Sequence, residues 1–133
     1  QKNLFLSSYQ PYNKIGDLLT KVDISILPYV SNITVAGNVG DITKFTSPLK
    51  LFDYMSCGKI ILCSDYKVLR EVLTNKNAIF IDNYRSPFSW KLAISKLKNS
   101  PEKNFIMGKN NYIQATKYNL KRRAEKILED KWA

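Results

Sequence analysis

The sequence predicts an α/β protein in which helices flank a parallel sheet. Apolar runs that are too short for helices alternate along the chain with stretches whose apolar residues follow helical spacing. One run, Ile60-Ile61-Leu62-Cys63, contains no charged residue, as expected for a strand covered on both faces of a parallel sheet. With 133 residues, 44% of them hydrophobic and 24% charged, the chain has the size and composition of one globular domain, which we expect to span residues 1–133.

The first part of the chain predicts two strands with a helix between them. Leu4-Phe5-Leu6 is expected to form a short strand, and Pro11-Tyr12-Asn13 to begin a helix. The apolar face of this helix is expected to comprise Ile15, Leu18, Leu19 and Val22. The second strand runs from Ile24 to Leu27 and ends at Pro28.

Residues 29–46 have no clear periodicity, and Gly37-Asn38-Val39-Gly40-Asp41 has the composition of turns. A connection this long is uncommon in a compact domain unless it is functional or mobile. It follows the carboxyl end of a strand, where open α/β sheets bind ligands. We interpret it as a flexible loop over a ligand site, with a disordered surface insertion as the alternative.

The next helix is marked at both ends. Ser47 is suited to cap its first amides, and Pro48 to occupy its first helical position. The helix is expected to reach about Cys57, where Gly58 supplies the left-handed residue that ends it. The buried run Ile60–Cys63 follows at once.

The remaining elements continue the alternation. We expect a short helix over Lys67–Leu73, a strand over Ala78–Ile81, and a helix that starts at Ser86-Pro87. The buried face of that helix is predicted to hold Trp90, Ala93, Ile94 and Leu97. A last helical stretch starts at Ser100-Pro101 and is expected to break near Gly108; its predicted apolar stripe is Ile106, Ile113, Leu120, Ala124, Ile127 and Leu128.

Lys50 has an unexpected charge for its position. It lies in the first turn of a helix, where the aligned peptide dipoles already place about half a positive charge. A cation is tolerated there when an anion lies between it and the free amides. Asp53 lies three residues further on the same face and could bind hydroxyl groups. The pair suits a sugar nucleotide, and an exposed Lys–Asp pair on an ordinary helix is the alternative.

The sequence from Ser47 to Lys59, Ser-Pro-Leu-Lys-Leu-Phe-Asp-Tyr-Met-Ser-Cys-Gly-Lys, resembles the donor-binding C-terminal domain of GT-B glycosyltransferases. The greatest resemblance is to the large retaining group called family 4. Ser64-Asp65, Leu69-Arg70-Glu71-Val72 and the order of the flanking strands and helices extend the likeness over nearly the whole chain. The resemblance implies a Rossmann-like fold and transfer of a sugar, with retention, from a UDP- or GDP-linked donor to a polysaccharide or glycolipid.

The resemblance also assigns donor-binding residues. Thr46, Ser47 and the backbone near Pro48 and Leu49 would contact the donor, and Lys50 would face its diphosphate. Asp53 matches a family glutamate that binds the ribose hydroxyls, with a side chain one methylene shorter. The family's other glutamate corresponds to Phe45, so the acid that helps to hold the donor sugar is missing. The catalytic residues remain unknown.

The resemblance makes this chain one part of a larger enzyme. The N-terminal acceptor domain of a GT-B enzyme has no counterpart here, nor do the first two strand–helix units of the donor domain. In the family's strand order, 3-2-1-4-5-6, Leu4–Ser7 would have no neighbours; it would pair with Ile24–Leu27 or with a second copy in a homodimer. We expect the isolated chain to bind nucleotide weakly and to be catalytically inert.

Charge and cysteine content limit the other possibilities. The net charge is +10, and residues 91–133 hold eleven basic and four acidic residues, a net of +7. This excess suits a peripheral contact with the inner face of a membrane, a phosphorylated acceptor or only a solvated surface. With no histidine and two isolated cysteines, neither a metal nor another cofactor is expected. Cys57 and Cys63 suit buried thiols in a reducing, cytoplasmic compartment.

Two other function classes compete with the enzyme. A degenerate, non-catalytic GT-B module could use the basic helices to bind a membrane or partner, and Phe45 favours this alternative. A nucleic-acid binder is supported only by charge, because Lys121-Arg122-Arg123 lacks aromatic stacking positions around it. We therefore expect no nucleic-acid partner.

Overall fold

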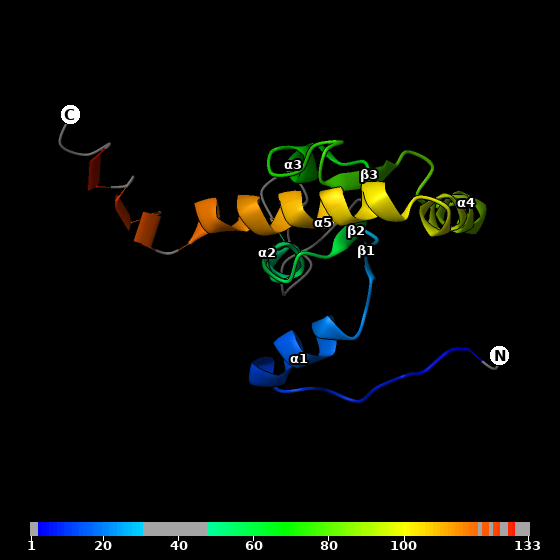
Figure 1. The fold of residues 1–133 in the computed structure, drawn as a ribbon, viewed down its shortest axis with the longest axis horizontal. Helices are drawn as coiled ribbons and strands as arrows, with labels where there is room; N and C mark the ends of the chain where they lie inside the picture. Colours follow the sequence, from blue (N-terminus) through cyan, green and yellow to red (C-terminus); the bar gives the residue numbers. More distant parts are fainter. Residues whose placement is uncertain (1–2, 31–47, 120, 123, 126–127, 130–133) are drawn as a thin grey trace, which may run out of the picture.

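A computed structural model describes residues 3–30, 48–119, 121–122, 124–125 and 128–129. Figure 1 shows a body formed by the sheet and α2 to α5, with α1 and the N-terminal segment below it. In chain order the elements are η1 (Tyr12–Lys14), α1 (Ile15–Thr20), β1 (Ile24–Leu27), α2 (Leu49–Ser56), β2 (Ile60–Ser64), α3 (Lys67–Arg70), β3 (Ala78–Ile81), α4 (Pro87–Lys98), α5 (Pro101–Ala115) and η2 (Thr116–Tyr118).

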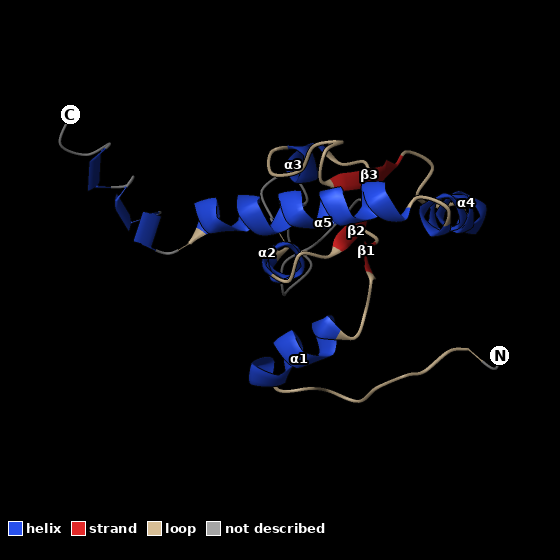
Figure 2. Cartoon of the chain, viewed as in Figure 1, coloured by secondary structure: helices blue, strands red, loops and turns tan. Residues whose placement is uncertain are grey.

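The three strands form one parallel sheet in the order β1-β2-β3. Ile24 pairs with Ile60 across the first ladder, and Ile61 pairs with Ala78 across the second. Figure 2 shows the helices around these strands, with α5 running across them. The predicted α/β class, with a Rossmann-like parallel sheet and flanking helices, is confirmed. In the family's strand order, 3-2-1-4-5-6, strands 4, 5 and 6 lie side by side in sequence. The observed order β1-β2-β3 matches these three strands.

Two apolar layers bury the sheet. The first joins it to α2 and α3 and comprises Leu27, Tyr29, Leu51, Met55, Ile61, Cys63, Val68, Leu69, Leu73 and Ala78. The second joins it to α4 and α5 and comprises Ile60, Leu62, Ile81, Ala93, Leu97 and Met107. Ile61, Leu62 and Cys63 have no exposed surface, so the predicted central strand is confirmed.

The turn from α2 into β2 is fixed by one glycine. Gly58 has φ +61°, and its amide donates to the carbonyl of Met55 at 2.9 Å. The amide of Lys59 donates to the carbonyl of Tyr54 at 3.0 Å, which completes a Schellman motif. The predicted end of this helix at Gly58 is therefore confirmed.

Helix α5 closes the amino edge of the sheet. The fully buried Asn111 donates from Nδ2 to the carbonyls of Lys59 and Asn77, at 2.8 and 2.7 Å. These carbonyls directly precede β2 and β3. A Cβ atom on Gly108 would lie 2.4 Å from the carbonyl oxygen of Gly58, so α5 approaches the α2–β2 turn as closely as glycine permits.

The N-terminal part differs from its prediction. The predicted strand at Leu4–Leu6 is wrong: these residues belong to no strand, and Phe5 and Leu6 are 90% exposed. No pairing with β1 occurs, because the segment runs beneath α1 (Figure 1), and an isolated strand has no ladder to stabilise it. The predicted apolar face of the first helix is mostly uncovered too, since only Leu19 of α1 is buried.

The last helical stretch also differs. Helix α5 is continuous through Gly108, so the predicted break there is wrong, and the helix ends instead at η2. Its buried residues are Met107, Gly108 and Asn111, whereas Ile106 and Ile113 of the predicted stripe are exposed. The physical reason is that α5 packs through a small residue and an amide, which an apolar pattern does not identify. Leu120 and Ile127 lie outside the described residues.

Candidate functional site

The amino end of α2 lies at the carboxyl edge of the sheet. Its carboxyl end turns at Gly58 directly into β2, so the helix runs antiparallel to the strand that follows it. Leu51, in the first turn, packs in the same apolar layer as Tyr29, which follows the end of β1. The predicted ligand site thus lies where open parallel sheets bind ligands.

The start of α2 is shifted by one residue from its prediction. Pro48 is the capping residue and not the first helical residue, because its ψ of 122° is extended. Its carbonyl accepts the first helical hydrogen bond from the amide of Leu51, at 3.0 Å. Leu49 begins the helix with its side chain 81% exposed. Thr46 and Ser47, as well as Phe45, lie outside the described residues.

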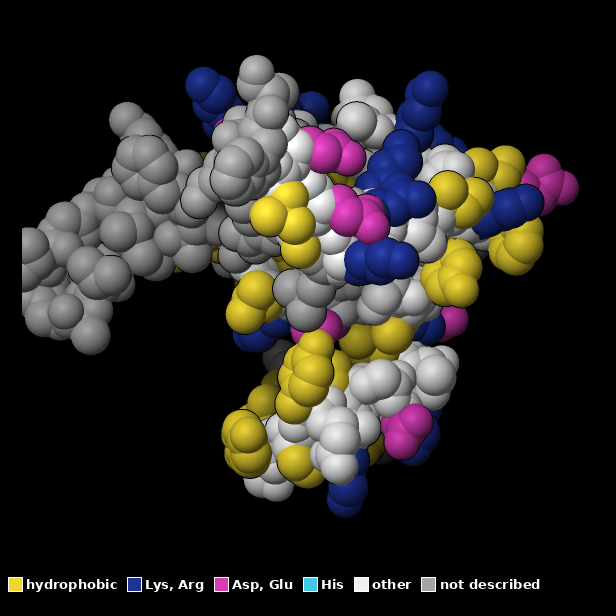
Figure 3. Space-filling model, turned by 90° about the vertical axis from the view of Figure 1, so that its left-hand side faces the viewer, with side chains coloured by type: hydrophobic (Ala, Val, Ile, Leu, Met, Phe, Trp, Pro, Cys, Tyr) yellow, Lys and Arg dark blue, Asp and Glu magenta, His cyan; other side chains and the backbone are white. Residues whose placement is uncertain are grey.

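Lys50 and Asp53 border one cavity. It has a volume of about 370 Å³ and lies between α2 and the segment that holds η1 and α1. Its lining residues are Tyr9, Gln10, Tyr12, Ile15, Leu18, Leu19, Lys50, Asp53 and Tyr54. Figure 3 shows the lower lobe, which contains this segment, with hydrophobic side chains on its surface beneath the body. The cavity thus has an apolar wall and a Lys–Asp pair, which suits an anionic group and hydroxyls.

Tyr12 contacts the carboxylate in this cavity. Its hydroxyl donates to Oδ1 of Asp53 at 3.0 Å. The donated hydrogen bond, and secondarily the negative charge of Asp53, raise the pKa of the Tyr12 hydroxyl. A group from the chain itself therefore occupies one acceptor site of the carboxylate that was predicted to bind ribose. Sequence reasoning missed this contact, because the two residues are 41 positions apart.

Three tyrosines gather at the carboxyl edge of the sheet. Tyr29 follows β1, Tyr66 follows β2 and Tyr84 follows β3. The ring centroids of Tyr29 and Tyr66 lie 5.8 Å apart, and those of Tyr66 and Tyr84 lie 5.3 Å apart with their hydroxyl oxygens at 2.7 Å. Sequence reasoning missed this cluster, although a tyrosine follows each strand by two or three positions. Because parallel strands end at a common edge of the sheet, that repetition could have predicted the cluster.

Next to these tyrosines, Asp65 and Arg70 form a bidentate ion pair. Arg70 donates from Nε to Oδ1 and from Nη2 to Oδ2, the second at 2.6 Å. The guanidinium also lies 3.9 Å from the centre of the Phe80 ring. The hydrogen bond from Arg70 is the main cause that lowers the pKa of Asp65. These contacts link the end of β2 to α3 and β3.

The family is shown by comparison with known proteins. A model of the family described as glycosyl transferases group 1 matches residues 1–114. The chain belongs to this family. Group 1 membership makes it a glycosyltransferase domain and implies a nucleotide-sugar donor and an acceptor. No solved structure matches the chain significantly.

Metal binding and membrane spanning are two further properties that bear on the described residues of this glycosyltransferase domain. Within that part of the chain, no group of three or more His, Cys, Asp or Glu side chains could hold a metal ion. None of the helices that the structure describes is both long and apolar enough to cross a membrane.

Proposed function

We propose that this chain is the donor-binding part of a retaining glycosyltransferase similar to family 4, and that it binds a UDP- or GDP-linked sugar. The observation that carries the proposal is that Lys50, in the first turn of α2, and Asp53 both line the cavity between α2 and the segment with η1 and α1. Family membership supports the donor class, and the cavity supports the residues. A polysaccharide or glycolipid is the proposed acceptor, and the cytoplasm the proposed location.

In this proposal the amino end of α2 holds the diphosphate. The aligned peptide dipoles place about half a positive charge there, and the Lys50 ammonium adds a full one. Both would stabilise the charge that develops on the departing diphosphate, in the way that a metal ion otherwise does. The backbone near Pro48 and Leu49 takes part in this contact, and Thr46 and Ser47 remain predictions.

Asp53 is the proposed ribose ligand. A carboxylate has about four acceptor sites, so a ribose hydroxyl can bind beside the Tyr12 hydroxyl or replace it. Transfer itself needs groups from an acceptor domain, and we propose that the chain is active only when joined to one.

Titration of the full chain with UDP and, separately, with GDP tests the proposal. We expect saturable binding that Lys50→Ala weakens by about tenfold or more, because a hydrogen bond to a charged group is lost. Lys76→Ala, on the turn before β3, is the matched control and should leave the affinity unchanged. Equal affinities for all three proteins, or binding only to an oligonucleotide, would overturn the assignment.

One observation favours the non-catalytic alternative. The Tyr12 hydroxyl donates a hydrogen bond to the Asp53 carboxylate, so this part of the site resembles a structural contact between two elements of the chain. Tyr12→Phe distinguishes the two functions, and Tyr112→Phe on α5 serves as its control. If Asp53 binds ribose, the variant should bind nucleotide about twofold to tenfold more tightly, because a competing hydrogen bond is gone. Lower stability with unchanged affinity would favour the interaction module.

A further inference from the structure

Helix α4 presents a basic and apolar surface outside the proposed donor site. It covers the sheet through Ala93 and Leu97, which are buried in the second apolar layer. Its outward residues include Phe88, which is 71% exposed, and Leu92, which is 46% exposed. These two lie four positions apart, so they form one stripe on the helix. Two large apolar side chains therefore face away from the core.

Cations accompany this stripe. Lys91, Lys96 and Lys98 are all exposed on α4. Residues 83–101 hold four basic residues, the fourth being Arg85, and no acidic residue. Asp82, directly before this stretch, lines the flank of α4 that holds Phe88, Leu92 and Lys96. The surface thus keeps a clear excess of positive charge.

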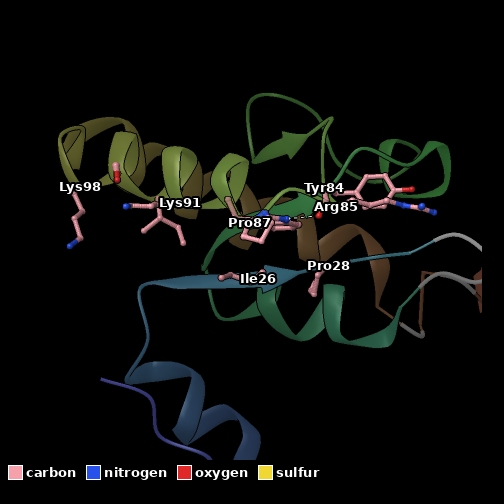
Figure 4. A pocket seen from close by; sticks show the side chains of 10 residues that line it. Ile26, Pro28, Tyr84, Arg85, Pro87, Lys91 and Lys98 are labelled. Atoms are coloured by element: carbon pink, nitrogen blue, oxygen red, sulfur yellow. Dashed lines mark hydrogen bonds between the residues drawn. The ribbon is translucent and has the colours of Figure 1, made fainter. Parts of the chain in front are cut away.

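The other flank of α4 borders an open groove. This groove has a volume of about 700 Å³, and its floor includes Ile26 of β1 and Pro28. Figure 4 shows Lys91 and Lys98 extending from α4 toward one end of it, while Tyr84 and Arg85 lie toward the other. Trp90 and Ile94 line the groove from the helix. Apolar side chains and lysines therefore line both flanks of α4.

We infer that the outward face of α4, with its apolar stripe and its lysines, binds the surface of a membrane that contains anionic phospholipid. Exposed phenylalanine and leucine on a lysine-rich amphipathic helix suit the boundary between head groups and acyl chains. The lysines attract anionic head groups, and the apolar side chains gain by leaving water. Phosphate-directed nucleic-acid binding would use the lysines but leave the apolar stripe uncovered. The helix lies on the membrane in this arrangement and does not cross it.

Vesicle sedimentation of the full chain tests the inference. We expect binding to equimolar phosphatidylglycerol and phosphatidylcholine and none to phosphatidylcholine alone. Each lysine near such a surface contributes about fivefold to partitioning, so combined Lys91→Gln, Lys96→Gln and Lys98→Gln should lower it roughly a hundredfold. A control that removes the same charge from other exposed lysines, Lys14→Gln, Lys21→Gln and Lys76→Gln, should lower it far less.

A second variant tests the apolar stripe. Phe88→Ser with Leu92→Ser should reduce partitioning by about tenfold, because the inserted apolar area is lost. Both side chains are exposed, so circular dichroism should show an unchanged fold.

No binding to either vesicle, equal binding to both, or equal loss in the two lysine variants would overturn the inference. So would oligonucleotide binding that competes with vesicles and needs the three lysines but not Phe88 and Leu92. Nucleotide titration is a separate measurement, so this inference and the proposed donor function can fail independently.

Discussion

The two ends of α2 meet different kinds of neighbour. At its carboxyl end, Gly58 lies against Gly108, and Asn111 joins the starts of β2 and β3 by buried hydrogen bonds. At its amino end, α2 faces the segment with η1 and α1 across a cavity, and the Tyr12–Asp53 hydrogen bond spans the two. The comparison teaches that α2 packs closely against the sheet and α5 but meets the segment with η1 and α1 across a cavity with an apolar wall.

The largest expected difference concerns apolar side chains at α2 and α1. Leu51 has no exposed surface, so Leu51→Ala should lower the free energy of unfolding by about 2–5 kcal/mol. Leu18 is 39% exposed beside the cavity, so Leu18→Ala should cost less than about 1 kcal/mol. Urea denaturation measures both. Similar losses would show that α1 packs as closely as the core does.

Two glycines provide the next test. Alanine at Gly108 brings a Cβ atom against the backbone of Gly58, so Gly108→Ala should cost about 1–3 kcal/mol of unfolding free energy. Gly16, in α1, has nothing within 4 Å of an added Cβ, so Gly16→Ala should gain up to about 1 kcal/mol. Thermal denaturation of the two variants compares the close contact with the open one. A lower melting temperature for Gly16→Ala would contradict the open space found around that residue.

The smallest expected effect is a pH dependence at the carboxyl edge. Arg70 lowers the pKa of Asp65, so the folded state favours the ionised carboxylate. This stabilisation is present above the ordinary aspartate pKa of about 3.9 and is lost as the pH falls through the lower folded value. Because Asp65 and Arg70 are 25% and 44% exposed, it should amount to about 1 kcal/mol or less.

Urea denaturation from neutral to acidic pH measures this contribution. Asp65→Asn should make the unfolding free energy fall less steeply as the pH is lowered. Asp17→Asn on α1 is the control, and it should leave the contribution of the Asp65–Arg70 ion pair to that slope unchanged. A slope that is unchanged in Asp65→Asn would show that the ion pair does not contribute.

Features set by local chemistry could be predicted from the sequence. Gly58 ends α2 because a left-handed residue is needed there, and the uncharged run that begins at Ile60 is buried because it contains no charged side chain. Leu4–Leu6 is an equally apolar run, but a strand needs a neighbour, and no neighbour is encoded in the run itself.

The candidate site likewise has a part that the sequence could predict and a part that it could not. Lys50 and Asp53 could be selected because a lysine in a first helical turn departs from the usual charge pattern. The contact of Tyr12 with Asp53 and the gathering of Tyr29, Tyr66 and Tyr84 depend on how distant segments are brought together. The contact face of α5 could not be predicted, because Gly108 and Asn111 carry no apolar signal.

The buried amide of Asn111 has a consequence for the timing of folding. Its partner carbonyls precede it by 52 and 34 positions, so the starts of β2 and β3 lack these hydrogen bonds until α5 has been synthesised. During translation, a nascent chain that stops before α5 would leave these two carbonyl groups to accept hydrogen bonds from water instead. The sheet would therefore be completed late, after the ribosome has released α5.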